Sequence, residues 1–203
     1  MPCGRWSHFK PDAGTGCPLV DESDMSSLQP AIRSASPADN TLLADLGRET
    51  FFETFAAENT PENMAAYLSE AFSPEKQGSE LADPATRFLI VEETGQAIGY
   101  ARLRSGQAPA AIVGKMPIEI VRFYVRKSWI GKGVGAQLMQ ACLLEAETAA
   151  SDVVWLDVWE RNQRAIAFYR QWEFVEVGAQ PFQLGEDRQR DLLMARALRG
   201  SAT

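Results

Sequence analysis

The sequence is poor in the residues that most often mark nucleophilic and metal sites. It contains one histidine, His8, and three cysteines, Cys3, Cys17 and Cys142, which form no Cys-x-x-Cys pair. A single histidine near the N-terminus argues against a serine–histidine or cysteine–histidine nucleophile. Three scattered cysteines argue against a zinc site or a disulfide framework, so we expect no metal and a reducing, cytoplasmic location.

Long apolar runs are also missing. No stretch approaches the roughly 18 to 20 apolar residues that cross a bilayer, and residues 1–19 lack the apolar core of a secretion signal. We therefore expect neither a membrane partner nor export. The length of 203 residues and the 45% hydrophobic content predict a poorly ordered tail over residues 1–27 and one domain over residues 28–199.

Basic charge is scarce in the first half of the chain. The net charge is −7, which disfavours nucleic acid as the main partner. Residues 1–100 hold 16 acidic and 6 basic side chains, whereas residues 101–203 hold 11 and 14. A phosphate-bearing ligand should therefore bind the second half. The glutamates between Glu49 and Glu70 form either an ordinary solvated face or a wall that attracts amines.

Hydrophobic periodicity predicts an α/β domain with a mixed sheet of about six or seven strands and about four helices, in the order β-α-α-β-β-β-α-β-α-β-β. The predicted helices cover residues 38–56, 61–72, 134–149 and 162–172, with a loop over 73–84. The predicted strands cover residues 31–34, 87–93, 96–104, 118–125, 152–160, 174–184 and 192–198. The strands on either side of the helix 134–149 should be parallel neighbours.

A glycine-rich turn follows the strand 118–125. Residues 130–135 read Ile-Gly-Lys-Gly-Val-Gly and lead into a predicted helix. Glycines let a ligand approach the backbone, and the unpaired N–H groups and the dipole of a helix N-terminus favour a phosphate. The pattern Gly131-x-Gly133-x-x-Ala136 also fits the dinucleotide fingerprint, with Asp157 as a candidate acid on a later strand.

Several observations count against a dinucleotide. The glycines lie two-thirds along the chain, and five residues separate Val125 from Gly131. One βαβ unit is evident, whereas a dinucleotide fold needs two. A P-loop is excluded because its Gly-Lys-Ser/Thr ending is missing. A purely structural turn is the other alternative.

A second pattern lies in the predicted helix 162–172. Asn162, Ile166 and Tyr169 have the spacing i, i+4, i+7 and share one helix face within about 40°. Asn162 and Tyr169 are then about 10 Å apart along the axis, which suits a polar contact and a phenol at opposite ends of an extended thiol arm. The alternative is that Asn162 only caps the helix and Tyr169 only fills the core.

Together the two patterns resemble those of GNAT-superfamily N-acetyltransferases, over about residues 28–198. The family's acetyl-CoA loop, Q/R-x-x-G-x-G/A after a strand, is similar to residues 130–135 after Phe123-x-Val125. The family's motif N-x-x-A-x-x-x-Y-x-x-x-G-F is matched by Asn162, Ala165, Tyr169 and Phe174. Two positions depart from the family: Ile130 replaces Gln or Arg, and Glu173 replaces a glycine.

The resemblance implies acetyl-CoA as co-substrate. The residues that it implies for binding are Phe123, Tyr124, Val125, Ile130, Gly131, Lys132, Gly133, Val134, Gly135 and Asn162. The Ile130 side chain cannot donate a hydrogen bond to pyrophosphate. The backbone N–H groups of residues 131–135, with Lys132 and Arg126, would have to bind it instead.

The resemblance also implies transfer of an acetyl group to a primary amine, which must lose a proton before it attacks. Glu119 is the implied base, with a structural ion pair to Arg122 as the alternative. Tyr169 is the implied acid for the departing thiolate, because a phenol pKa near ~10 suits a thiol of about 8.5. We expect a backbone N–H at a bulge near Tyr124 or Val125 to hold the oxyanion, and Cys142 to lie in the core.

The segment from Phe182 to Met194 more closely resembles the polyamine (spermidine/spermine) acetyltransferase branch. The expected partner is therefore a small-molecule amine, and a homodimer is left open. Two alternatives are also open. One is a protein N-terminal or lysine acetyltransferase, which a long open groove would favour. The other is a non-catalytic, regulatory module that binds acetyl-CoA.

Overall fold

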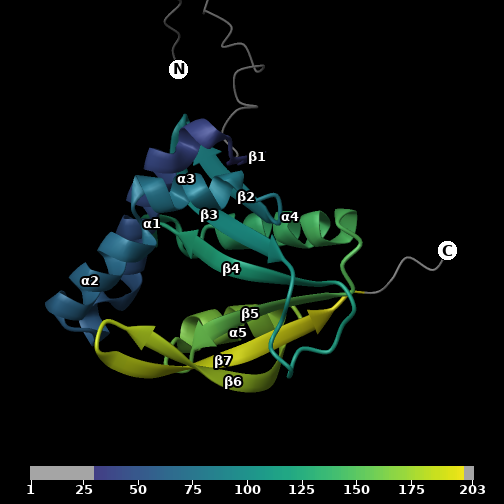
Figure 1. Ribbon diagram of the computed structural model, residues 1–203. Coiled ribbons are helices and arrows are strands. Elements are labelled where there is room, and N and C mark those ends of the chain that lie inside the picture. Colours follow the sequence, from purple (N-terminus) through teal and green to yellow (C-terminus); the bar gives the residue numbers. More distant parts are fainter. Residues whose placement is uncertain (1–29, 199–203) are drawn as a thin grey trace, which may run out of the picture.

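The computed structural model (Figure 1) describes residues 30–198, so the predicted tail 1–27 lies outside the described part. The strands within it are β1 (Ala31–Ser34), β2 (Thr86–Glu93), β3 (Gln96–Ser105), β4 (Pro117–Val125), β5 (Val153–Trp159), β6 (Val175–Leu184) and β7 (Asp187–Ala197). The α-helices within it are α1 (Asn40–Phe55), α2 (Pro61–Ala71), α3 (Pro74–Ala82), α4 (Val134–Thr148) and α5 (Gln163–Gln171).

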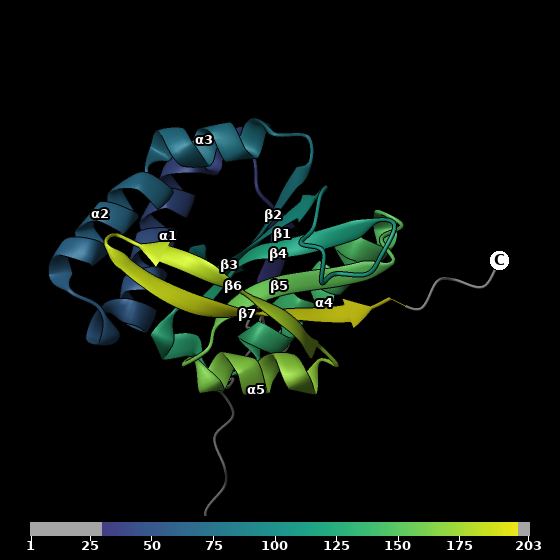
Figure 2. The same ribbon diagram turned by 60° about the horizontal axis from the view of Figure 1, so that its bottom comes forward.

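All the described strands form one mixed sheet in the order β1-β2-β3-β4-β5-β7-β6. The pair β4 and β5, joined through α4, is parallel, and the other neighbours are antiparallel. Helices α1, α2 and α3 cover one face, while α4 and α5 cover the other (Figure 2). The α/β prediction and the βαβ unit are confirmed. Among residues 30–198, no helix has the length and apolar character needed to cross a bilayer.

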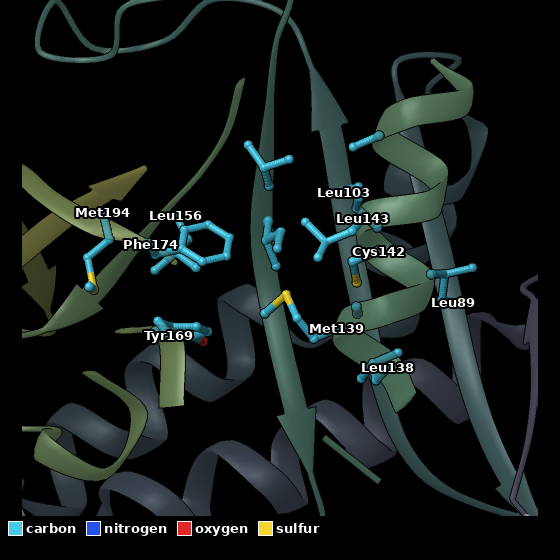
Figure 3. Close-up of a cluster of buried hydrophobic side chains, with 14 of the residues drawn as sticks. Leu89, Leu103, Leu138, Met139, Cys142, Leu143, Leu156, Tyr169, Phe174 and Met194 are labelled. Atoms are coloured by element: carbon cyan, nitrogen blue, oxygen red, sulfur yellow. The ribbon is translucent and has the colours of Figure 1, made fainter. Parts of the chain in front are cut away.

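The main core lies between the sheet and the helices α4 and α5. Leu138, Met139 and Cys142 project from one face of α4 and are fully buried against the sheet. Tyr169 and Phe174 extend the same core from the α5 side (Figure 3). Burial raises the pKa of the Cys142 thiol, and its predicted place in the core is confirmed.

The predicted loop over residues 73–84 is wrong, because α3 occupies most of it. The Ser73 side chain caps the first turn, and a proline follows at the first helical position. The buried face of α3 is polar: Glu80 contacts the guanidinium groups of Arg102 and Arg122 at 2.8 and 2.5 Å. Since charge holds this helix to the sheet, apolar periodicity does not indicate it.

The bulge in β4 lies earlier than the sequence predicts. The pairing of β4 with β3 shifts at Val121, which has no partner between Ile120 and Arg122. The predicted bulge at Tyr124 or Val125 is therefore wrong, because both residues pair regularly. A bulge changes which side chains face each side of a sheet. After it, Arg122 and Tyr124 face helices α1 to α3.

Strands β4 and β5 pair only over their first three residues. Residues 117–119 lie opposite residues 153–155, and no further pairs follow within the described chain. β4 nevertheless stays paired with β3 as far as Val125. One edge of residues 120–125 is therefore left without a neighbouring strand, in the middle of the sheet.

Candidate active site

A cavity of about 390 Å³ lies where β4 and β5 separate. Its walls come from the glycine turn, residues 120–125 of β4, the end of β5 and one face of α5. Beyond these, the cavity continues between α1, α2 and the hairpin of β6 and β7. The glycine turn and the predicted face of α5 therefore share one cavity, although Gly131 and Asn162 are 31 positions apart in the sequence.

The glycine turn depends on two left-handed residues. Gly131 and Gly133 have φ angles of +83° and +86°, which favour glycine over other residues, and Gly133 is the N-cap of α4. A Cβ at either position would meet no atom within 4 Å, so the conformation rather than crowding requires glycine. The turn delivers the free N–H groups of the first turn of α4 to one end of the cavity.

The predicted turn residues divide into two groups. Val134 is buried in the core, and the Lys132 ammonium lies over the Trp129 ring at 4.6 Å, so neither lines the cavity. Ile130 does line the cavity and is 38% exposed. The turn residues in the cavity wall are Ile130, Gly131, Gly133 and Gly135.

The structure places both predicted residues of α5 in the cavity wall. The Oδ1 atom of Asn162 accepts a hydrogen bond of 3.1 Å from the backbone N–H of Ala165, so this side chain caps α5 and lines the cavity as well. Tyr169 is 7% exposed, and its ring packs against Phe123 and Phe174 with centroid distances of 6.2 and 5.9 Å. Burial raises the pKa of its phenol, which therefore stays protonated near neutral pH.

A model of the acetyltransferase (GNAT) family matches residues 46–174, a span that includes the glycine turn, β4 and α5. The chain belongs to the GNAT acetyltransferase family. It is therefore an acyltransferase of the N-acetyltransferase type, which confirms the family and the enzyme class expected from the two motifs.

Known GNAT proteins support this placement. An uncharacterized N-acetyltransferase in the pepI 3′ region of Lactobacillus delbrueckii subsp. lactis is 36% identical over 153 residues, 75% of this chain and 88% of the relative. Another, from Mycobacterium tuberculosis, is 30% identical over 156 residues, 77% of this chain and 96% of the relative. The PaiA N-acetyltransferase of Thermoplasma acidophilum, solved with coenzyme A, shares the fold with a TM-score of 0.66 at 20% identity, over 84% of this chain and 99% of that one.

Residues 120–125 of β4 supply another wall of this GNAT cavity. Phe123, Tyr124 and Val125 all line it, as the family resemblance implies. Their unpaired edge leaves backbone N–H and C=O groups directed to the space between the strands. Such an edge can bind an extended amide chain as a neighbouring strand would.

The basic side chains near the turn are arranged differently from expectation. Arg126 forms an ion pair of 2.9 Å with Glu49, and the backbone N–H of Lys127 donates to Glu53 at 2.9 Å. Two of the α1 glutamates therefore fix the turn to α1. Arg164, in the first turn of α5, lines the cavity instead. Its place two residues after the Asn162 cap was the only sequence signal for this role.

Glu119 lies outside the cavity wall. It is 7% exposed, and its Oε2 atom accepts hydrogen bonds from Arg104, at 3.1 Å from Nε and 2.5 Å from Nη2. Burial raises the pKa of Glu119, and Arg104 partly opposes that shift. Arg122, the alternative partner considered from the sequence, pairs with Glu80.

Two other carboxylates do line the cavity, at the end away from the glycine turn. Asp191 on β7 is 7% exposed, and burial, with the nearby charge of Asp157, raises its pKa to about 7. Asp157 on β5 accepts a hydrogen bond of 2.8 Å from Gln180, and burial raises its pKa too. An aspartate inside an apolar strand was the available signal for Asp157, whereas Asp191 precedes the predicted strand 192–198.

Aromatic rings surround these carboxylates. Tyr67 on α2 lies 4.6 Å from the Phe51 ring and 5.5 Å from the Phe182 ring, measured between centroids. Phe55 and Trp159 are 6.0 Å apart in the same wall. We call this end of the cavity the acidic chamber, defined by its two carboxylates and these five rings.

Helix α2 and the hairpin of β6 and β7, whose turn lies beside α2 in Figure 2, both contribute to the walls of the acidic chamber and are joined by hydrogen bonds. The backbone N–H of Glu186 donates to the Oδ1 atom of Asn63 at 2.9 Å. The side-chain amide of Gln189 donates to Asn59 at 2.6 Å. These two hydrogen bonds and the contact between the Tyr67 and Phe182 rings hold α2 and the hairpin together beside the chamber.

Proposed function

We propose that the protein transfers an acetyl group from acetyl-CoA to the primary amine of a small aliphatic amine, with polyamines such as spermidine and spermine as the class that its cavity fits best. The acidic chamber carries this proposal, because it combines the buried carboxylate of Asp191 and the partly buried carboxylate of Asp157 with aromatic walls. Carboxylates attract an ammonium group, while aromatic faces suit both cations and the methylene groups between them.

The other end of the cavity suits acetyl-CoA, which supplies an activated acetyl thioester. The N–H groups of the glycine turn and the first turn of α4 would hold the pyrophosphate. Arg164 would add a positive charge, because the Ile130 side chain has no hydrogen-bond donor and the Lys132 ammonium lies over the Trp129 ring. The free edge of residues 120–125 would bind the amides of the pantetheine arm, and Asn162 would contact the same arm.

Tyr169 would protonate the departing thiolate. Its phenol lies in the cavity wall, and burial keeps it protonated until a sulfur anion forms beside it. A backbone N–H near Tyr124 or Val125 would hold the negative charge that develops on the acetyl oxygen. Because Arg104 holds Glu119 outside the cavity wall, a role for Glu119 as the base would require a chain of water molecules.

The contacts that join α2 to the hairpin of β6 and β7 beside the acidic chamber favour a small amine over a protein substrate. We expect a folded protein or a long peptide to need α2 and the hairpin to move apart, which would break the contact between Asn63 and Glu186. A polyamine has the width of a single alkyl chain and carries several positive charges. These charges complement both the chamber and the deficit of basic residues in the first half of the chain.

A turnover screen tests this proposal. Release of free thiol from acetyl-CoA would be followed with spermidine, spermine, simple diamines, amino acids and peptides, and binding of acetyl-CoA would be measured separately by calorimetry. We expect the polyamines or diamines to give the highest kcat/KM. A peptide as the best substrate would overturn the amine class, and a lack of acetyl-CoA binding would overturn the site assignment.

A further inference from the structure

An amine substrate reaches the enzyme as an ammonium ion, because the pKa of an alkylamine is about 10. It cannot attack a thioester until a base removes a proton. Of the carboxylates Glu119, Asp157 and Asp191 on this face of the sheet, Glu119 is paired with Arg104, and Asp157 accepts a hydrogen bond from Gln180. Asp191 differs from both, because its buried Oδ1 atom has no hydrogen-bond partner within residues 30–198.

We propose that Asp191 is the catalytic base that takes the proton from the substrate ammonium, and that Asp157 holds the positive charge beside it. This inference rests on the proposed function and assigns its missing proton acceptor. It replaces the Glu119 assignment, which the family resemblance alone suggested.

Strand register brings the two carboxylates together. Asp191 on β7 lies opposite Trp159 on β5 and opposite Gln180 on β6. Asp157 precedes Trp159 by two residues and therefore points to the same face of the sheet. Both carboxylates line the cavity that also contains Tyr169, so an amine between them can reach the thioester end.

The charged surroundings of Asp191 suit a base that works near neutral pH. Asp157 and Glu160, from β5 and the residue after it, raise its pKa, with burial as the largest cause. Tyr67 faces it from α2, and its own pKa is raised to about 12, so it stays neutral. With a pKa of about 7, Asp191 is partly ionised at neutral pH and can accept a proton effectively.

The protons balance as follows. Asp191 takes one proton from the ammonium and releases it to solvent after the product leaves. The amine nitrogen forms its bond to the acetyl carbon as the carbon–sulfur bond breaks, and the Tyr169 proton goes to the sulfur. The second nitrogen proton restores the phenol, so one proton is released for each acetyl group transferred.

The variant Asp191→Asn tests the assignment, with acetyl-CoA and spermidine as the probes. We expect kcat at pH 7 to fall about 100-fold, the usual size of a lost general base, with the KM for acetyl-CoA within about twofold of the wild type. The wild-type kcat/KM should fall below about pH 7, and the variant should lack this acid limb. The difference should narrow toward pH 10, as the amine becomes neutral without help.

Three further variants separate a base from a structural residue. Asp191→Glu should recover part of the rate, and Glu119→Gln should retain the acid limb whatever its kcat. Asp157→Asn should move the acid limb to lower pH, because it removes a negative charge that raises the pKa of Asp191.

The outcomes are separable. An unchanged kcat and acid limb in Asp191→Asn, or loss of the limb in Glu119→Gln, would overturn the assignment. If Asp191→Asn no longer binds acetyl-CoA in calorimetry, the Asp157→Asn profile decides, and an unmoved limb overturns the assignment. If acetyl-CoA binds but the wild type acetylates no amine, the proposed function itself fails, and the base assignment fails with it.

Discussion

The Oδ1 atom of Asn63 accepts a 2.9 Å hydrogen bond from the backbone N–H of Glu186, 123 positions later in the chain. Gly185 makes this approach possible, because its φ is +58° and a Cβ there would lie 2.3 Å from the same Oδ1 atom. The contact joins α2 to the turn between β6 and β7, two elements that border the acidic chamber. We expect it to limit which amines can enter.

We expect Asn63→Ala to loosen this contact between α2 and the hairpin. One neutral hydrogen bond contributes roughly 0.5 to 1.5 kcal/mol, so the KM for spermidine should rise about 2- to 10-fold. Turnover of a short peptide amine should increase at the same time. Steady-state kinetics with both amines measure the effect. Ser69→Ala is the matched control, since the Ser69 hydroxyl bonds within α2, to Ala66, and parallel changes in the two variants would contradict the prediction.

Removal of the Tyr169 hydroxyl should slow the chemical step. For Tyr169→Phe we expect kcat to fall about 100-fold and the KM for acetyl-CoA to stay nearly constant, because a general acid acts in the transition state. Tyr100→Phe is the control: the Tyr100 hydroxyl is buried without a partner in residues 30–198 and lies outside the cavity wall. If Tyr169→Phe kept full turnover with every accepted amine, the assignment of Tyr169 as the general acid would be wrong.

Arg164 should replace the donor that Ile130 cannot provide. A charge-assisted hydrogen bond contributes about 1.5 to 3 kcal/mol, so Arg164→Ala should raise the KM for acetyl-CoA about 10- to 100-fold. The loss should shrink at high salt, where screening weakens the wild-type contact. Arg170→Ala, on the same helix but outside the cavity wall, controls for the loss of charge. An equal effect of both variants would refute a specific phosphate contact.

We expect the ionised form of Asp191 to lower the free energy of unfolding at high pH. Its folded-state pKa of about 7 lies above the usual 3.8, so the protonated form favours folding, and stability falls as the pH rises between these values. Asp191→Asn should therefore stabilise the protein at pH 8, by at most about 4 kcal/mol, and have little effect at pH 4. Urea unfolding at both pH values measures this.

Asp39 gives the control of opposite sign. Its hydrogen bonds with Arg33 lower its pKa to about 2, so its contribution is present above pH 3.8 and is lost toward pH 2. Asp39→Asn should therefore destabilise the protein at pH 8. A lower stability of Asp191→Asn than of the wild type at pH 8 would contradict the linkage argument.

Apolar periodicity predicted the strands and helices that use an apolar face, and it failed where polar contacts fix an element. Helix α3 buries Gln77 and Glu80, so no apolar stripe indicates it. The start of β7 reads Asp-Arg-Gln-Arg-Asp, yet it pairs with β6 from Asp187 onward. The strand was therefore predicted to begin too late, and Asp191 was left outside it.

The site could be predicted where short motifs carry it. Gly131, Gly133, Asn162 and Tyr169 could be predicted as site residues because the turn and the helix face are each local features of the sequence. All four line the cavity. The partner of Glu119 depends instead on the register between β3 and β4, which places Arg104 opposite it. No local pattern specifies such a register, so the residues of the acidic chamber become evident only in the folded chain.

Because β4 and β5 separate early, the sheet has an inner strand edge that no strand of residues 30–198 covers. Exposed strand borders tend to recruit other extended chains. Here helices on both faces restrict access to a narrow, strand-like molecule, and the pantetheine arm has that shape. We expect the co-substrate to complete the sheet during each turnover, and its departure as coenzyme A to return the backbone amides of residues 120–125 to faster hydrogen exchange.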